Sequence, residues 1–347
     1  MRPGGIRKGS RLIRFLVLTA KRLVWFVPTV AGLIAIVFIV SHIIPADPAA
    51  LIAGATATEA QKAAVRAQYG LDKPLVVQLG NYYLNLAQGD LGKSLFTTRA
   101  VAGDLFARLP ATIELTFAAM LVAIVAGTPL GVLAALRRNS AFDHVVRLIT
   151  VSGLAIASFW LGLMLQWVFA MKLGWTPLRG RIEGFPPPGI TGLLTLDALL
   201  AGDFDAFASA LWHLALPTLT LAFPALATVV RFTRAGVLET IQSAAVQYQR
   251  SMGIPWTVIV WKYILRGALT STVTQIGLLF GMLLGGAIVI ETVFDWPGIG
   301  DYAFNAILQS DYNAVMGFTL YAGVMLILAN LAVDLVHALI DPRETRG

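Results

Sequence analysis

The sequence contains no cysteine, which excludes disulfide bonds and thiolate metal sites. Histidine is also scarce, and the histidines lack the paired spacing of a metal site. The G-x-S-x-G motif of a serine hydrolase is absent as well. We therefore expect no catalytic residue, metal ion or cofactor in this chain. The four histidines are His42, His144, His213 and His337.

Charged residues are also scarce. Asp, Glu, Lys and Arg make up 13% of the 347 residues, whereas hydrophobic residues make up 57%. A soluble domain is typically about 25% charged, so we expect most of this surface to be buried in lipid. The formal charge of +7 suggests a nucleic-acid partner, but no basic face carries a recognition motif. We therefore expect contact with a lipid bilayer and not with nucleic acid.

The most prominent feature of the sequence is its long apolar stretches. A run of about 20 apolar residues is long enough to cross a bilayer, and the sequence has six such runs. We therefore predict an all-α polytopic membrane protein with six transmembrane helices and with both termini on the same side. The six runs are 23–44, 113–136, 148–171, 211–230, 269–290 and 314–340.

The basic residues predict the orientation of these spans. Of the 26 Lys and Arg residues, 17 fall on one side of the predicted topology and nine on the other. The richer side is expected to be cytoplasmic, which makes 1–22 and 341–347 cytoplasmic tails. No A-x-A-like site follows the first apolar run, so we expect an uncleaved span and not a signal peptide.

The segment 45–112 is predicted to be external. It contains two helix-compatible stretches, 58–69 and 75–87, but its apolar content is modest for its length. We therefore expect a small external cap between the first and second spans. The remaining residues 113–340 form a five-span core with a cytoplasmic loop at 231–268.

A phosphate-binding motif is imitated at GDLGKS (89–94). Gly92, Lys93 and Ser94 match the end of G-x-x-x-x-G-K-[ST], but Ala87 stands where the motif needs glycine. No hydrophobic strand precedes the stretch. We therefore expect no ATP binding here.

The cytoplasmic loop 231–268 contains a helix–glycine–helix pattern, SAAVQYQRSMGIPWTV. Gly253 is expected to end one helix with a left-handed backbone, and Pro255 fits the start of the next. A short protruding helix suits a groove in a soluble partner. A basic structural elbow at the lipid headgroups is an equal alternative from these residues alone.

Ten stretches, in their order and spacing, resemble one family across nearly the whole chain. They are RLVWFVPTVAGLIAIVFIVSHIIPADPAA (22–50), YGLDKPLVVQ (69–78), GDLGKS (89–94), RLPATIELT (108–116), TPLGVLAALRRNSAFD (128–143), SFWLGL (158–163), LALPTLTLA (214–222), RFTRAGVLE (231–239), GGAIVIETVFDWPGIG (285–300) and DLVHALIDPR (334–343). The chain is similar to membrane permease subunits of bacterial binding-protein-dependent ABC importers, in the dipeptide/oligopeptide/nickel permease family.

The resemblance implies a type I ABC importer permease fold in the inner membrane. It implies a second homologous permease chain, two cytoplasmic ATPase subunits that bind ATP and Mg²⁺, and a periplasmic substrate-binding protein. The chain itself is then a transport subunit and not an enzyme. Peptides are the expected substrate, with nickel, glutathione and oligosaccharides as alternatives. A secondary transporter is the alternative of another class, although such proteins normally hold charged groups near the membrane midplane.

The resemblance also implies that 244–254 is a coupling helix that docks into an ATPase. Family members usually carry Ala, Ala and Lys where this chain has Gln249, Ser251 and Met252, and Asp-Tyr at positions 244 and 245, which are both alanine here. We therefore expect dedicated ATPase partners. The residues expected to contact the ATPase are Ala245, Tyr248, Gln249, Arg250, Ser251, Met252, Gly253 and Ile254.

One more short stretch follows the fifth span. Asp295, Trp296, Pro297 and Gly298 form the sequence DWPG, which predicts a tight turn with tryptophan as an interfacial anchor. The alternative interpretation is an external gate or a contact for the binding protein.

Overall fold

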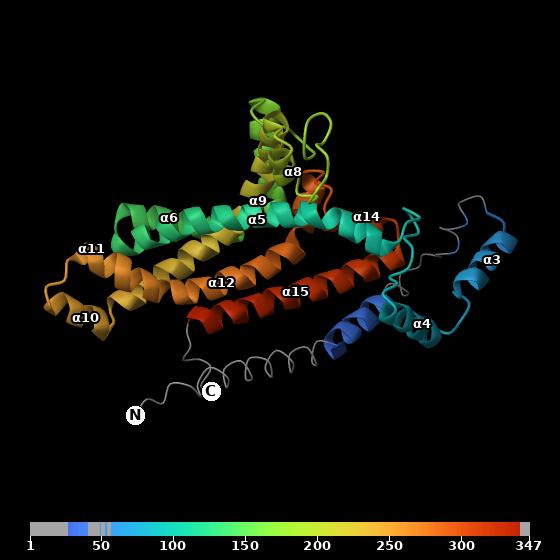
Figure 1. Ribbon diagram of the computed structural model, residues 1–347, viewed down its shortest axis with the longest axis horizontal. Helices are drawn as coiled ribbons and strands as arrows, with labels where there is room; N and C mark the ends of the chain where they lie inside the picture. Colours follow the sequence, from blue (N-terminus) through green and yellow to red (C-terminus); the bar gives the residue numbers. More distant parts are fainter. Residues whose placement is uncertain (1–26, 41–48, 50–52, 54–56, 341–347) are drawn as a thin grey trace. The chain divides into compact units, whose positions relative to one another are not determined.

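The computed structural model describes residues 27–40, 49, 53 and 57–340, and within these ranges the chain is almost entirely helical (Figure 1). The labelled elements are α3 (Glu59–Tyr69), α4 (Leu75–Ala87), α5 (Val101–Leu136), α6 (Ala141–Ala155), α7 (Ser158–Leu165), η1 (Gln166–Lys172), α8 (Leu194–Leu200), α9 (Phe204–Ile241), α10 (Ala244–Ser251), α11 (Trp256–Val258), η2 (Ile259–Ile264), α12 (Leu265–Gly286), α13 (Ile288–Val293), α14 (Ile299–Leu308) and α15 (Tyr312–Ile340). The segments η1 and η2 are π-helical.

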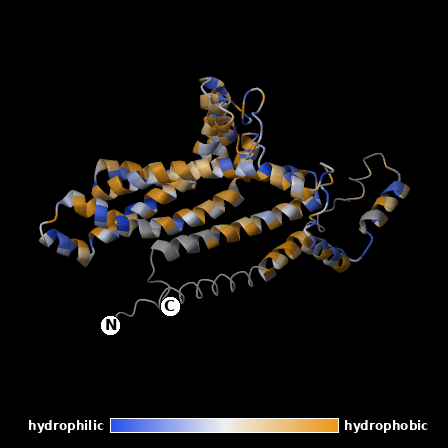
Figure 2. Cartoon of the chain, in the orientation of Figure 1, coloured by the Kyte–Doolittle hydropathy of each residue, from blue (hydrophilic) through white to orange (hydrophobic). Residues whose placement is uncertain are grey.

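The long helices carry the expected apolar spans. Among the described residues, Val101–Leu136, Phe204–Ile241 and Tyr312–Leu331 are long and apolar enough to cross a membrane. Shorter apolar helices, Val27–Val40 and Gln275–Gly285, lie where the first and fifth spans are expected. Figure 2 shows these long helices as mainly hydrophobic. The all-α fold is confirmed, whereas the count of six spans stays a prediction.

The third expected span, 148–171, is not one straight helix. The helices Ala141–Ala155 and Ser158–Lys172 meet at an angle of 106°. Ile156 and Ala157 between them have extended backbones, with ψ of 128° and 127°, and this interrupts the helical hydrogen-bond ladder. Neither residue is glycine or proline, so the sequence gives no sign of this break.

The described residues fall into two units. One comprises the described residues within 1–109 and 298–324, and the other comprises those within 110–297 and 325–340. The helices α5 and α15 each pass from one unit into the other. The core of the first unit joins the start of α5 to α14 and to the start of α15. Its buried residues are Val101, Leu105, Ile299, Tyr302, Ala306 and Ala314.

The two helices expected in the external cap are confirmed within the first unit. Thr58 caps α3 through a reciprocal pair of hydrogen bonds with Gln61, and Gly70 ends that helix with φ of 65°. The helix α4 follows after Pro74. Part of the expected cap segment 45–112 lies outside the described residues.

The Gly92-Lys93-Ser94 stretch has a structural role in this unit. The Ser94 hydroxyl donates to Asp311 Oδ2 at 2.5 Å, and Asn313 Nδ2 donates to the Lys93 carbonyl at 2.8 Å. Asp311 in turn accepts from the backbone N–H of Ala314 in the first turn of α15. The stretch therefore binds the start of a helix through side-chain contacts.

The second unit has its main core between α5, α9, α12 and α13. Close approach of helices depends on glycine at two places. A Cβ atom at Gly131 of α5 would lie 2.8 Å from Thr233 Cβ of α9, and one at Gly281 of α12 would lie 2.8 Å from Ala329 Cβ of α15. At Gly285, one turn further along α12, no described atom lies within 4 Å of such a Cβ. Glycine is therefore needed for close packing at Gly281 and not at Gly285.

Candidate functional site

The helix α10 forms within the expected coupling stretch and has defined ends. The Ser243 side chain accepts a hydrogen bond from the Val246 backbone N–H, which caps the first turn. After the helix, Gly253 has φ of 73°, in the left-handed region that glycine adopts without strain. Pro255 then stands at the N-cap of α11. The predicted helix–glycine–helix arrangement is confirmed.

One side chain attaches α10 to the rest of the second unit. Val246 is 2% exposed, and no other residue of α10 is buried. It lies in an apolar cluster built by α5, α9, η2 and α12. The other buried members of this cluster are Val132, Ala135, Val237, Ile259, Val260, Ile264 and Ala268.

The opposite side of α10 is open. Tyr248 and Met252 are 64% and 62% exposed. The Arg250 guanidinium lies 4.9 Å from the centre of the Trp256 ring, so the basic head stays near the turn at Gly253. The Ser251 hydroxyl donates to the Tyr248 carbonyl at 2.8 Å.

The remaining expected coupling residues take different positions. Ala245 is exposed, and Ile254 is partly buried against the Val246 cluster. The side-chain oxygen of Gln249 is buried and meets no hydrogen-bond donor. The structure therefore gives α10 an open face of polar and large apolar side chains and one buried residue, Val246.

A buried ion pair lies between α6 and α9, ten residues before α10. Arg234 of α9 donates to both carboxylate oxygens of Asp143, from Nε at 2.7 Å and from Nη2 at 2.9 Å. The Asn139 backbone N–H adds a third hydrogen bond at 3.0 Å, and Arg147 Nε lies 3.7 Å away. A two-point contact of this kind fixes orientation as well as distance. It therefore ties the start of α6 to the part of α9 that leads into α10.

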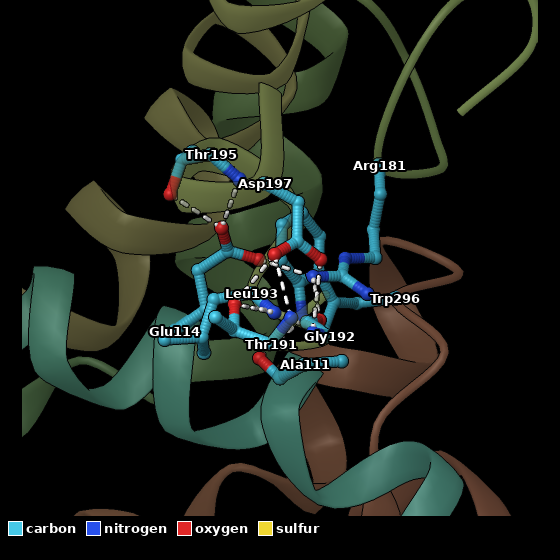
Figure 3. A network of polar contacts seen from close by, with 9 residues as sticks. All are labelled: Ala111, Glu114, Arg181, Thr191, Gly192, Leu193, Thr195, Asp197 and Trp296. Atoms are coloured by element: carbon cyan, nitrogen blue, oxygen red, sulfur yellow. Dashed lines mark hydrogen bonds and ion pairs between the residues drawn. The ribbon is translucent and has the colours of Figure 1, made fainter. Parts of the chain in front are cut away.

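A second polar network lies at the other end of this unit (Figure 3). Glu114 of α5 is buried, and its Oε1 accepts from the Thr195 backbone N–H at 2.7 Å and from the Thr195 hydroxyl at 2.6 Å. Its other oxygen forms an ion pair with Arg181. The carboxylate therefore holds both ends of the segment 181–195, which contains the FPPPG stretch.

Asp197 of α8 closes the same segment. Its carboxylate accepts from the backbone N–H and the hydroxyl of Thr191, both at 2.7 Å, and from the Gly192 N–H at 2.9 Å. Burial by itself raises the pKa of this carboxyl group, but these hydrogen bonds stabilise the charged form and lower the pKa below its ordinary value. Asp197 is therefore a negatively charged anchor for the loop at neutral pH.

Trp296 is part of this network and does not act as an interfacial anchor. It is 1% exposed, and its indole N–H donates to the Ala111 carbonyl of α5 at 2.9 Å. The Arg181 guanidinium lies 5.2 Å from its ring centre. The anchor interpretation is therefore wrong, because an anchor at the membrane surface has to face the headgroups.

The other residues of the DWPG stretch form the predicted turn. Asp295 is exposed with φ of 52°, Pro297 is exposed, and the buried Gly298 is the N-cap of α14. The role of these residues as an external gate stays a prediction.

The sequence interpretation missed both ion pairs and the buried attachment of α10. Asp143 and Arg234 are 91 residues apart, and Glu114 and Arg181 are 67 residues apart. No local spacing connects such pairs. A usable signal existed only for Val246, which is the one large aliphatic residue within an otherwise polar or small helix.

Two family models match the chain. The model for the binding-protein-dependent transport system inner membrane component matches residues 127–346. The model for the N-terminal part of such a membrane component matches residues 12–116. Together they cover both described units.

Curated relatives match over nearly the full length. The probable D,D-dipeptide transport system permease protein DdpB of Escherichia coli (strain K12) is 44% identical over 92% of this chain and 94% of its own. The dipeptide transport system permease protein DppB of Alkalihalophilus pseudofirmus is 39% identical over 93% of this chain and 97% of its own. The glutathione transport system permease protein GsiC of Pectobacterium atrosepticum is 36% identical over 93% of this chain and 96% of its own.

A solved structure supports the fold independently. A chain of the MetNI methionine ABC transporter, in inward-facing conformations, is similar to 68% of this chain and 96% of its own, with a TM-score of 0.51 and 19% sequence identity. At that identity the likeness concerns the fold, which is that of an ABC importer permease. Since the family models and the relatives agree over most of the length, this chain belongs to the family of binding-protein-dependent transport system inner membrane components.

Proposed function

We propose that this chain is the permease subunit of an ATP-driven importer of peptides. It forms half of a translocation path, and a second homologous permease chain forms the other half. The observation that carries this proposal is α10, a helix with defined ends, an open face and one buried attachment. Peptide permeases at 44% and 39% identity support the substrate class.

In the proposed mechanism, two cytoplasmic ATPase subunits bind ATP and Mg²⁺ and move together. The helix α10 follows them, with the exposed side chains of Tyr248, Arg250 and Met252 in contact with the ATPase. The buried side chain of Val246 passes the motion to α5, α9 and η2, because these elements enclose it. Both termini lie in the cytoplasm, and a periplasmic binding protein delivers the substrate. The chain itself hydrolyses no ATP.

The ion pair between Asp143 and Arg234 has a defined part in this mechanism. It joins α6 and α9 close to the base of α10. Because protein interiors are close-packed, a displacement of one joined helix displaces the other. The two helices therefore respond to α10 as one body, and the segment with the predicted external gate at Asp295–Gly298 responds at the far end.

Glutathione is the second candidate substrate, since the GsiC relative is 36% identical over 93% of this chain. Nickel and oligosaccharides are further alternatives within the family. Competition between a labelled dipeptide and unlabelled candidate substrates distinguishes these alternatives. A peptide importer loses uptake of a labelled dipeptide when unlabelled dipeptide is added, and keeps it when glutathione is added.

The test of the proposed function is purification of the tagged chain from its native membrane, followed by mass spectrometry and reconstitution into vesicles. We expect a second permease chain and ATPase subunits to purify with it, and uptake to require ATP. A chain that purifies as a homo-oligomer and transports with an ion gradient in place of ATP would overturn the proposal and favour a secondary transporter.

A further inference from the structure

The helix α4 has a face that none of the described residues covers. It is 13 residues long, contains no charged residue and has no buried residue. Such a helix, apolar on one side and unpartnered, needs an explanation in a chain that otherwise packs its helices closely.

One side of α4 packs on the protein. Leu79, Tyr82, Tyr83 and Leu86 recur at helical spacing and are all partly buried. The Tyr83 hydroxyl donates to the Ala31 carbonyl at 2.5 Å, which attaches α4 to the apolar helix Val27–Val40. The position of α4 against that helix is therefore fixed by a specific contact.

The uncovered side of α4 divides into two stripes. Val76 is 82% exposed and Leu84 is 63% exposed, and Val77 is also exposed beside them. Asn81 and Asn85, one helical turn apart, are exposed on the next stripe round the helix. The apolar stripe therefore lies between the protein-facing side and a neutral polar stripe.

We propose that α4 lies in the plane of the membrane at its external surface, with Val76, Val77 and Leu84 among the lipid acyl chains. A helix of 13 residues is about 20 Å long, which is too short to cross a hydrocarbon core of about 30 Å. An apolar stripe beside a polar stripe is the pattern of a helix in the interface.

Continuity with the neighbouring helix identifies lipid as the occupant. Val27, Ile36 and Ile39 of the helix Val27–Val40 are exposed and apolar, as expected for a span in contact with lipid. The hydrogen bond from Tyr83 attaches α4 to this same helix. Because α4 carries no charged residue, it also has no group that would pair with the charges of a soluble partner.

Charged residues frame the helix on both sides. Asp72 and Lys73 precede it, and Asp90 and Lys93 follow it. Charged side chains therefore stand at both ends of a neutral helix, as expected where the chain enters and leaves the membrane interface. The helix then holds the loop that begins after Ala87 at a fixed depth in the membrane.

The test uses the absence of cysteine, because a single introduced cysteine is then the only thiol of this chain, and cysteines of the partner subunits are replaced beforehand. The full chain, with its partner subunits, is reconstituted in nanodiscs of phosphatidylethanolamine and phosphatidylglycerol. A spin label is placed by Val76→Cys or Leu84→Cys on the apolar stripe. Matched labels are placed by Asn81→Cys or Asn85→Cys on the polar stripe. Collision rates with oxygen, which concentrates in lipid, and with a water-soluble nickel chelate are then measured.

We expect the labels at positions 76 and 84 to collide severalfold more with oxygen, relative to the nickel chelate, than the labels at positions 81 and 85. Equal preference for the nickel chelate at all four positions would place the stripe in water and overturn the proposal. Protection of positions 76 and 84 from both reagents in the complex would place a protein partner there and also overturn it. Substrate uptake by each labelled complex is measured as a control for folding. This control is independent of the collision rates.

Discussion

The helices α4 and α10 are both short, and each is attached to the chain by few contacts, yet their open faces differ. The face of α4 is neutral and carries Val76 and Leu84 beside two asparagines. The exposed side chains of α10 and of the turn after it include Tyr248, Arg250 and Met252. Exposure alone therefore does not identify the partner. The composition of the exposed face does, because lipid accepts no charge and a protein groove accepts both charge and apolar surface.

The attachments of the two helices differ as much as their faces. The segment leading into α10 is held by a buried, two-point ion pair and α10 itself by Val246, whereas α4 is held by partly buried side chains and the Tyr83 hydrogen bond. In the proposed mechanism α10 transmits the motion of the ATPase, which requires a firm attachment. A helix resting in lipid gains its stability from the lipid and needs less from the protein.

The largest expected effect comes from removing the ion pair at the base of α10. Arg234→Met leaves the Asp143 carboxylate buried without its main partner, and we expect the complex to lose about 3–5 kcal/mol of unfolding free energy. Denaturant unfolding in detergent measures this loss. Arg138→Met, at an exposed position of the adjoining loop, is the control and should change little. A double variant with Asp143→Asn should recover part of the loss, and no recovery would contradict the stated cause.

The next effect concerns the turn after α10. Gly253→Pro cannot keep φ of 73°, since the proline ring holds φ near −65°, so the helix end has to move. We expect transport per ATP hydrolysed to fall by about tenfold, as for a strain of 1–3 kcal/mol. Gly253→Asn is the matched variant, because asparagine tolerates this backbone and no atom within 4 Å would meet its Cβ. Equal transport by the two variants would show that the turn is not needed.

One substitution made in both helices sharpens the comparison directly. Val246→Ala removes buried methyl groups and should cost about 1–2 kcal/mol and several-fold in coupling of ATP hydrolysis to uptake. Val76→Ala, at an exposed position, should change the unfolding free energy in detergent by less than about 0.5 kcal/mol. Similar losses in the two variants would mean that Val76, like Val246, packs against protein.

The smallest effect is expected at the hydrogen bond of α4. Tyr83→Phe removes one donor and leaves the Ala31 carbonyl without it, at a cost of about 1 kcal/mol. Thermal unfolding of the complex in detergent and in nanodiscs measures the change. We expect a smaller change in nanodiscs, because lipid contact keeps α4 in place there. A larger change in nanodiscs would contradict the lipid contact.

The sequence allowed the local features of these two helices to be predicted. The helix 75–87 follows from apolar spacing, and the left-handed backbone of Gly253 follows from the chemistry of glycine at a helix end. Features that depend on long-range packing were not predictable. Trp296 looked like a surface anchor because its partner, the Ala111 carbonyl, is 185 residues away.

The bend after α6 illustrates the same limit. Ile156 and Ala157 lie in an apolar run that fits a straight span, and only the backbone angles reveal the break. The buried ion pairs are a third case, because either member by itself reads as an ordinary charge near a helix end. Hydrophobic periodicity and turn chemistry were therefore enough to predict the helices. The side-chain contacts between helices could be found only from the structure.

The single buried residue of α10 has a consequence for how such importers diversify. Val246 is the one buried residue of the helix and Gln249 is partly buried, so the exposed residues can change without disturbing the packing of the membrane core. In the proposed mechanism, the surface of α10 that contacts the ATPase is then exchangeable. A coupling helix transplanted from a relative, with valine kept at position 246, would redirect this permease to another motor while leaving its transport path intact.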